Sequence, residues 1–165
     1  NTRTLFEHAM AVTERNYLAH FLVGNELAKE QRVDEAIEHY QRALEIRPRE
    51  HKAHMQLGLA WSKKGDAEQA MACYRRALEI NPKDAKAYNN RGAAYKNKGL
   101  YDRAIGDFNK TLEINPKFAL AYRNRGFLYM VKLRKKERAC PDWKQACELG
   151  LCGNYNLAKR RGLCR

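Results

Sequence analysis

The stretch ALEIRP at residues 43–48 recurs as ALEINP at residues 77–82 and as TLEINP at residues 111–116, so each copy begins 34 residues after the previous one. A fixed period of this length is typical of stacked helical repeats, in which each unit buries its apolar face against its neighbours. Each copy ends in proline, which cannot continue a helix, so the prolines mark boundaries between repeats. The period predicts an all-α solenoid.

The same register covers most of the chain when residues 17–50, 51–84 and 85–118 are aligned as three repeats. Small residues let two helices approach closely, and large ones fill the space between them. The recurring residues are Gly24, Gly58 and Gly92 at position 8, Ala36, Ala70 and Ala104 at position 20, and Tyr40, Tyr74 and Phe108 at position 24. This pattern resembles the tetratricopeptide repeat family, which implies an α-α superhelix of paired helices A and B.

We predict that residues 1–165 form one domain with atypical repeats at both ends. Residues 2–14 fit helix B of a truncated repeat, and residues 119–150 fit a fourth repeat if one residue is inserted near residues 133–136. We expect Pro141 in the first turn of the fourth repeat's second helix, where a missing N–H costs nothing. Residues 154–162 are expected to form a polar capping helix with Leu157 and Ala158 facing inward.

The charge of the chain is unevenly distributed. The net charge is +13, yet residues 1–82 carry 12 basic and 12 acidic residues, whereas residues 83–165 carry 20 basic and 7 acidic ones. The excess indicates either an anionic neighbour or a solvated surface. The sequence contains no apolar run long enough to span a membrane.

Four of the five cysteines lie within the last 26 residues. Their spacing lacks the close pairs of a zinc site, which leaves free buried thiols or disulfides as the better interpretations. If the last two helices run antiparallel, Cys147 and Cys152 flank the turn while Cys140 and Cys164 meet at the open end. We therefore predict the nested pairs Cys147–Cys152 and Cys140–Cys164, with Cys73 buried and free.

The resemblance to tetratricopeptide repeats also implies a binding groove, because helix A positions 2, 5, 6, 9, 12 and 13 line the concave face in that family. These positions are apolar in the first repeat, through Phe21 and Leu22, and become basic and amide-rich later. Amides pair with a peptide backbone and basic side chains select carboxylates, so we expect an extended, acidic peptide as partner. The predicted groove residues are Lys52, Gln56, Lys63, Lys86, Asn89, Asn90, Lys96, Asn97, Arg123 and Asn124.

Two further segments are similar to a group of bacterial membrane proteins. Residues 1–20 resemble the junction at which polytopic glycosyltransferases of the lipid-linked-sugar type pass into a C-terminal tetratricopeptide array, and residues 139–150 resemble the cysteine-bearing end of some such arrays. The resemblance implies an extracytoplasmic, periplasmic domain that is tethered to a membrane catalyst and has no catalytic residue of its own. Reduced cysteines would instead favour the cytoplasm.

The sequence favours no enzymatic interpretation and no cofactor. His51 and His54 lie three residues apart without an evident third metal ligand, and no phosphate-binding loop or nucleophile motif is present. The basic run at residues 132–138 favours an alternative function, an electrostatic anchor on anionic lipid or polymer through residues 132–161. Nucleic acid is a poorer interpretation because aromatic interleaving is absent. Self-association through the open N-terminal half-repeat is a further prediction.

Overall fold

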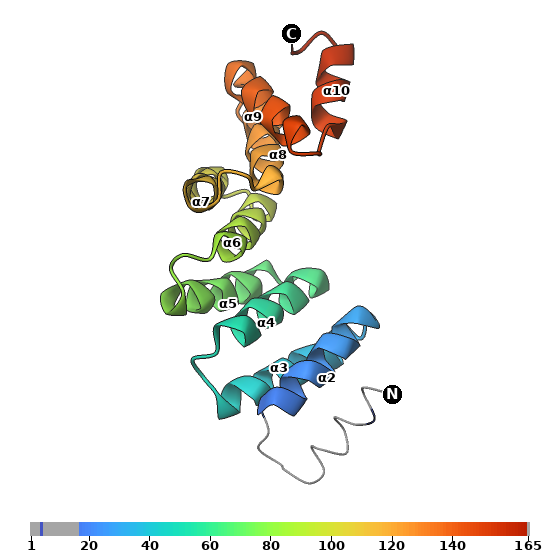
Figure 1. Cartoon of the computed structure of the whole chain (residues 1–165), viewed down its shortest axis with the longest axis vertical. Coiled ribbons are helices and arrows are strands. Elements are labelled where there is room, and N and C mark those ends of the chain that lie inside the picture. The colour runs from blue at the N-terminus through green and yellow to red at the C-terminus, as the bar shows by residue number, and fades with distance from the viewer. Residues whose placement is uncertain (1–3, 5–16, 165) are drawn as a thin grey trace. The chain divides into compact units, whose positions relative to one another are not determined.

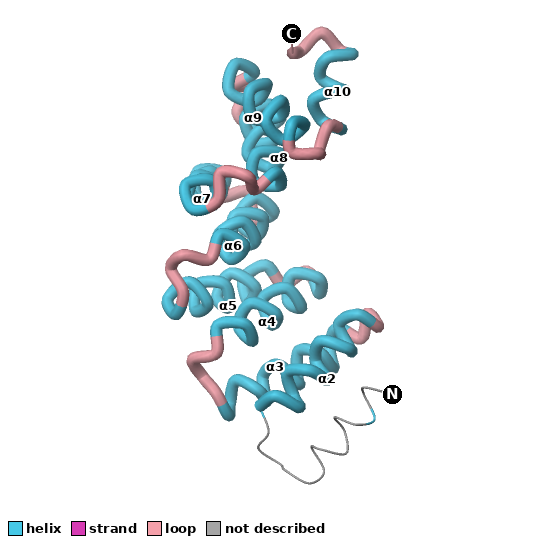
Figure 2. Tube along the Cα trace, in the orientation of Figure 1, coloured by secondary structure: helices cyan, strands magenta, loops and turns pink. Residues whose placement is uncertain are grey.

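A computed structural model of the chain describes residue 4 and residues 17–164, and all of the regular structure in this part is helical (Figures 1 and 2). The predicted all-α class is thereby confirmed for the described residues. The helix expected over residues 2–14 lies outside them. The helices are α2 (Tyr17–Lys29), α3 (Val33–Ile46), α4 (His51–Lys64), α5 (Ala67–Ile80), α6 (Ala85–Asn97), α7 (Tyr101–Ile114), α8 (Ala119–Phe127), a π-helical turn (Leu128–Lys132), α9 (Lys136–Glu148) and α10 (Gly153–Arg160).

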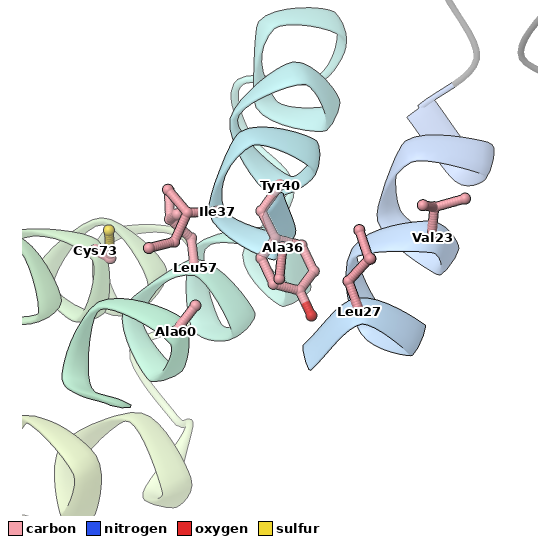
Figure 3. Close-up of a cluster of buried hydrophobic side chains, with 8 residues drawn as sticks. All are labelled: Val23, Leu27, Ala36, Ile37, Tyr40, Leu57, Ala60 and Cys73. Carbon is pink, nitrogen blue, oxygen red and sulfur yellow. The ribbon is translucent and has the colours of Figure 1, made fainter. Parts of the chain in front are cut away.

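Contacts within the chain divide it into two compact units, residues 1–82 and residues 83–165. In the first unit, α2 packs on α3, α3 on α4 and α4 on α5. Figure 3 shows its core side chains converging from these four helices. In the second unit, α6 packs on α7 and α8 on α9, while α10 packs on α9. Each helix pair thus buries one apolar face in its own unit.

Each helix A meets its helix B at a glycine that faces an aromatic ring. A β-carbon at Gly58 would lie 2.6 Å from Cε1 of Tyr74, and one at Gly92 would lie 2.8 Å from Cε1 of Phe108. Gly24 and Tyr40 make the same contact in the first repeat. This agrees with the roles expected of positions 8 and 24, because any larger residue than glycine would force the two helices apart.

The fourth helix pair contains the extra residue. In the third repeat Leu100 N donates to Tyr95 O, whereas in the fourth Lys135 N donates to Tyr129 O, one residue further along. The left-handed turn residue shifts likewise, from position 15 at Gly99 to position 16 at Arg134. The insertion therefore lies between Tyr129 and Lys135, and the π-helical turn accommodates it before the predicted residues 133–136 are reached.

Two expectations for the C-terminal helices are wrong. Helix α9 begins at Lys136, so Pro141 lies inside it and not in its first turn. The helix starts early because Ala139 N already donates to Lys135 O, and it forgoes one internal hydrogen bond at the proline. In α10, Ala158 is buried at 2% exposure, but Leu157 is 50% exposed and does not face inward.

Candidate functional site

In the first unit, two of the predicted groove residues line a pocket of about 540 Å³. Gln56 and Lys63 on α4 face Leu22, Asn25 and Lys29 on α2, whereas Lys52 is exposed and does not line the pocket. The pocket therefore lies between successive A helices, where the family resemblance implies a groove.

The pocket is organised by a hydrogen-bonded network around Asn25. Oδ1 of Asn25 accepts from the Tyr40 hydroxyl at 2.9 Å and from Nε2 of Gln56 at 3.0 Å. Among the described residues, Nδ2 of Asn25 and Oε1 of Gln56 have no further protein partner. One donor and one acceptor thus remain side by side, the complement that an extended peptide backbone requires.

The charges of this pocket are largely satisfied locally. Lys29 forms an ion pair with Glu26 at 2.9 Å, and Nζ of Lys63 donates to the carbonyl oxygen of Ala28 at 3.3 Å. The first unit consequently offers a nearly neutral, amide-lined and apolar pocket.

In the second unit, Lys96 on α6 and Arg123 on α8 lie close enough to repel each other. Burial, and then the positive charge of Arg123, hold the pKa of Lys96 below its ordinary value. Nζ of Lys96 also lies 5.9 Å from the ring centroid of Phe127. Neither cation has a carboxylate partner in the described part of the chain. The pair can accept an anion, because a carboxylate would relieve the repulsion between like charges.

The two adjacent asparagines of α6 form a second polar group in this unit. Asn89 is buried at 6% exposure, and its Nδ2 donates to Oδ1 of Asn90 at 3.3 Å. Oδ1 of Asn89 has no hydrogen-bond partner in the described part of the chain. A buried acceptor without a partner is costly, so this oxygen lowers the stability of the second unit. Because it is screened from solvent, it offers no contact to a ligand in this conformation.

Lys86 and Asn97 are exposed and Asn124 is half-buried, and none of these three side chains has a hydrogen-bond partner in the described part of the chain. Sequence reasoning missed the Tyr40 hydroxyl, which holds Asn25 in place. An aromatic residue at position 24 of the repeat indicated only a packing role for Tyr40.

The cysteines of the second unit are paired as Cys140–Cys164 and Cys147–Cys152. These are the partners that the antiparallel arrangement of α9 and α10 led us to expect. Cys73 is buried and free, in agreement with the prediction.

The described residues hold no group of three potential metal-ligating side chains. Nε2 of His54 lies 2.9 Å from the carbonyl oxygen of Pro48, so it engages the loop that precedes α4. No described helix is long and apolar enough to cross a membrane.

The chain is similar to several solved structures across nearly its whole length. "Crystal structure of MamA" has a TM-score of 0.84 at 24% identity, covering 95% of this chain and 89% of that one. "MamA 41-end from Desulfovibrio magneticus RS-1" has a TM-score of 0.83 at 20% identity, covering 89% and 82%. "Crystal structure of YrrB: a TPR protein with an unusual peptide-binding site" has a TM-score of 0.81 at 23% identity, covering 96% and 81%. At these identities the likeness shows the fold alone. No curated protein matches the chain.

Family models match the repeats themselves. The model described as "TPR repeat" matches residues 24–65 and 61–99, and the model described as "Tetratricopeptide repeat" matches residues 85–118. Together they take in residues 24–118, more than half of the 165-residue chain. Solenoids of this kind present extended surfaces for binding, so the fold indicates a protein-interaction scaffold. The chain belongs to the tetratricopeptide repeat family.

Proposed function

We propose that this chain is a non-catalytic interaction scaffold that binds extended, acidic peptide segments on the A helices of its two units. The observation that carries the proposal is a pair of half-buried cations on two A helices in contact, Lys96 on α6 and Arg123 on α8, which lack a carboxylate partner among the described residues. A carboxylate bound near them would be attracted by both charges and would offset their mutual repulsion. The partly buried setting of Lys96 strengthens both effects.

Polar groups on the A helices of each unit support recognition of a peptide and not only of a free anion. In the second unit, the half-buried amides of Asn90 and Asn124 can pair with a peptide backbone. In the first unit, Asn25 and Gln56 offer a donor and an acceptor beside the apolar Leu22 and Leu59. We assign the same role to the remaining predicted groove residues, Lys52, Lys63, Lys86 and Asn97, as supporting contacts along the two A-helix surfaces.

The test is a binding titration with a fluorescein-labelled Gly-Ser peptide that carries several glutamates. Arg123→Gln and Lys96→Gln should each weaken binding about tenfold, whereas Lys117→Gln, which removes an exposed lysine of the same unit, should leave it unchanged. Binding should also weaken with salt, since the contacts are electrostatic. Equal affinity in all four proteins would reject the cation pair as the binding site.

A second candidate function, the electrostatic anchor, is favoured by the basic run of the fourth repeat. Lys132, Arg134, Lys135, Lys136 and Arg138 are all exposed. Such a cluster is attracted to anionic headgroups or polymers. Binding to anionic vesicles that persists in Arg123→Gln and disappears near molar salt would favour this function over the peptide groove.

We also propose an extracytoplasmic location, next to a membrane-bound glycosyltransferase, for this domain. Two disulfides support it, because such bonds persist in oxidising compartments. Mass analysis of the protein from its native source, without reductant, should find four oxidised cysteines. Five free thiols would reject this location. Self-association through the N-terminal half-repeat remains a prediction, since that segment lies outside the described residues.

A further inference from the structure

A second pocket, which we call the cap pocket, lies in the second unit between the end of the fourth helix A and the capping helix α10. Its volume is about 300 Å³. Large apolar side chains are unusually exposed at it: Phe127 is 37% exposed, Val131 51% and Leu157 50%. The lining residues are Phe127, Met130, Val131, Trp143, Asn154, Leu157, Ala158, Arg161 and Leu163.

Two local departures from the regular repeat build this pocket. The inserted residue turns Leu128–Lys132 into a π-helical turn, and Met130 and Val131 of that turn form one wall. Such turns occur often at functional sites. The opposite wall is α10, which is anchored through buried Ala158 and through the Cys140–Cys164 disulfide. Leu157 stands exposed on the α10 wall, so both departures contribute to the apolar lining of the pocket.

The charged side chains at the cap pocket are positive. Arg161 is its single charged lining residue. Lys96 lies over the ring of Phe127 at the border of the pocket. Of the seven acidic residues in the second unit, Asp107 and Asp142 are already paired with Arg91 and Arg125. A ligand that fits must combine an apolar group with negative charge.

We propose that the cap pocket binds a partner protein through a large apolar side chain flanked by acidic residues. The apolar side chain would enter between Val131, Trp143 and Leu157, and the flanking carboxylates would meet Arg161 and Lys96. A pocket that is concave suits a single side chain, whereas insertion into a membrane relies on an apolar face that protrudes. This site goes beyond the groove of the proposed function, with which it shares Phe127, Met130 and Val131 at groove positions 9, 12 and 13 and the neighbouring Lys96.

Tryptophan fluorescence can report the binding of a labelled peptide at the cap pocket. The chain has two tryptophans, Trp61 in the first unit and Trp143 in the pocket wall. In a Trp61→Phe protein, Trp143 is the sole tryptophan and can be excited selectively. The probes are dansyl-labelled Gly-Ser peptides in which one Leu or Phe stands between glutamates. We expect energy transfer from Trp143 to the dansyl group with at least one of them, and about tenfold weaker binding when the apolar residue is replaced by Ala.

Leu157→Asp is the discriminating variant, because it places a carboxylate on the pocket wall at a half-exposed position. We expect it to weaken peptide binding at least about tenfold. Leu100→Asp is the matched control: Leu100 is 41% exposed in the same unit, stands outside the groove positions and does not line the pocket. Val131→Asp should repeat the effect of Leu157→Asp from the opposite wall.

Three outcomes would overturn the proposal. They are no binding of any probe peptide, equal binding by Leu157→Asp and the parent protein, or an equal loss in Leu100→Asp. If the peptides fail while phosphatidylglycerol vesicles bind and Leu157→Asp abolishes that binding, the pocket is a membrane contact instead. Arg123→Gln leaves the pocket lining intact, so failure of the groove and failure of the cap pocket are distinguishable.

Discussion

In the first unit, the seam between paired helices carries an apolar side chain of helix A at the point where, in the second unit, it carries the arginine of a buried ion pair. Position 7 of helix A is Val23 and then Leu57, and both are buried. In the next two repeats it is Arg91 and Arg125. The facing position 23 of helix B changes with it, from His39 and Cys73 to Asp107 and Asp142.

The ion pairs of the second unit are bidentate and well shielded. Nε and Nη2 of Arg91 donate to Asp107 at 2.8 Å each, and the side chains are 19% and 8% exposed. Arg125 binds Asp142 in the same way, at 2.8 and 2.6 Å. The guanidinium of Arg91 also lies 5.5 Å from the ring centroid of Tyr88. Hydrogen bonding to the Asp107 carboxylate raises the pKa of Arg91 above its ordinary value, so the guanidinium stays charged.

The repeat geometry does not depend on whether the seam side chains are apolar or charged. Gly58 against Tyr74 and Gly92 against Phe108 approach equally closely in both kinds of repeat. A buried ion pair gives little net stability over an apolar pair, because desolvation of the charges offsets their attraction. The loss of one partner alone, however, leaves a buried charge without compensation. The second unit should therefore be the more sensitive to single substitutions.

The largest effect is expected from Asp107→Ala. It leaves the guanidinium of Arg91 partly buried without its carboxylate, which typically costs about 3–5 kcal/mol. Urea unfolding followed by circular dichroism would measure the loss, and hydrogen exchange of α6 and α7 would localise it to the second unit. A loss below about 1 kcal/mol would show that solvent compensates Arg91.

The double variant Arg91→Leu with Asp107→Cys is the control, because it copies the seam of Leu57 and Cys73 from the first unit. We expect it to match the stability of the parent chain or to exceed it by about 1–4 kcal/mol. A double variant as unstable as Asp107→Ala would contradict the equivalence of the two seams.

The disulfides provide a second contrast between the units, since both lie in the second. Cys140→Ser with Cys164→Ser opens a link between residues separated by 24 positions, and Cys147→Ser with Cys152→Ser opens one between residues separated by 5. Loop-closure entropy predicts losses of about 3.5 kcal/mol and about 2 kcal/mol, respectively. Hydrogen exchange should show the losses in α9 and α10 and leave α2 to α5 unchanged.

Cys73 serves as the internal control for that experiment. Burial raises the pKa of its thiol to about 11, so iodoacetamide at neutral pH should modify it only slowly. Rapid alkylation of Cys73 in either double variant would mean that the first unit had also opened, which would contradict a local effect of the disulfides.

The sequence was sufficient to predict contacts that depend on spacing within one repeat. Gly24 and Tyr40, or Cys147 and Cys152, are brought together by two short helices and the turn between them. The pairing of Arg91 with Asp107 was not foreseen, because a basic and an acidic residue on different helices are both compatible with solvated surface positions. The same pair recurs one repeat later as Arg125 and Asp142, once the inserted residue is allowed for. This recurrence was the signal that could have revealed the pairing of Arg91 with Asp107.

The cap pocket could not be predicted from the sequence, for a different reason. Neighbouring residues of a helix point in directions about 100° apart, so Leu157 and Ala158 could not be ranked as inward or outward without their surroundings. The register showed that one residue is inserted in the fourth repeat. The helix takes up that residue in the π-helical turn that begins at the fully buried Leu128, and the register alone does not specify this position.

The smallest effect is a pH dependence that should be confined to the first unit, which holds all of the chain's histidines. Nδ1 of His20 lies 3.3 Å from Nδ1 of His39 across the seam that Arg91 and Asp107 occupy later. Burial, and then the charges of His39 and Arg42, lower the pKa of His20 below its ordinary value of 6.5, although Glu45 opposes them.

Because the pKa of His20 is lowered in the folded state, the unfolded chain binds the proton more readily than the folded one. Stability should be complete above pH 6.5 and should decrease as the pH falls toward the lower folded pKa. Hydrogen-exchange protection of α2 and α3 should decrease between pH 7.5 and 5.5, with α6 and α7 as the histidine-free reference. His20→Gln should remove most of this decrease, and an undiminished decrease in that variant would assign the effect to other groups.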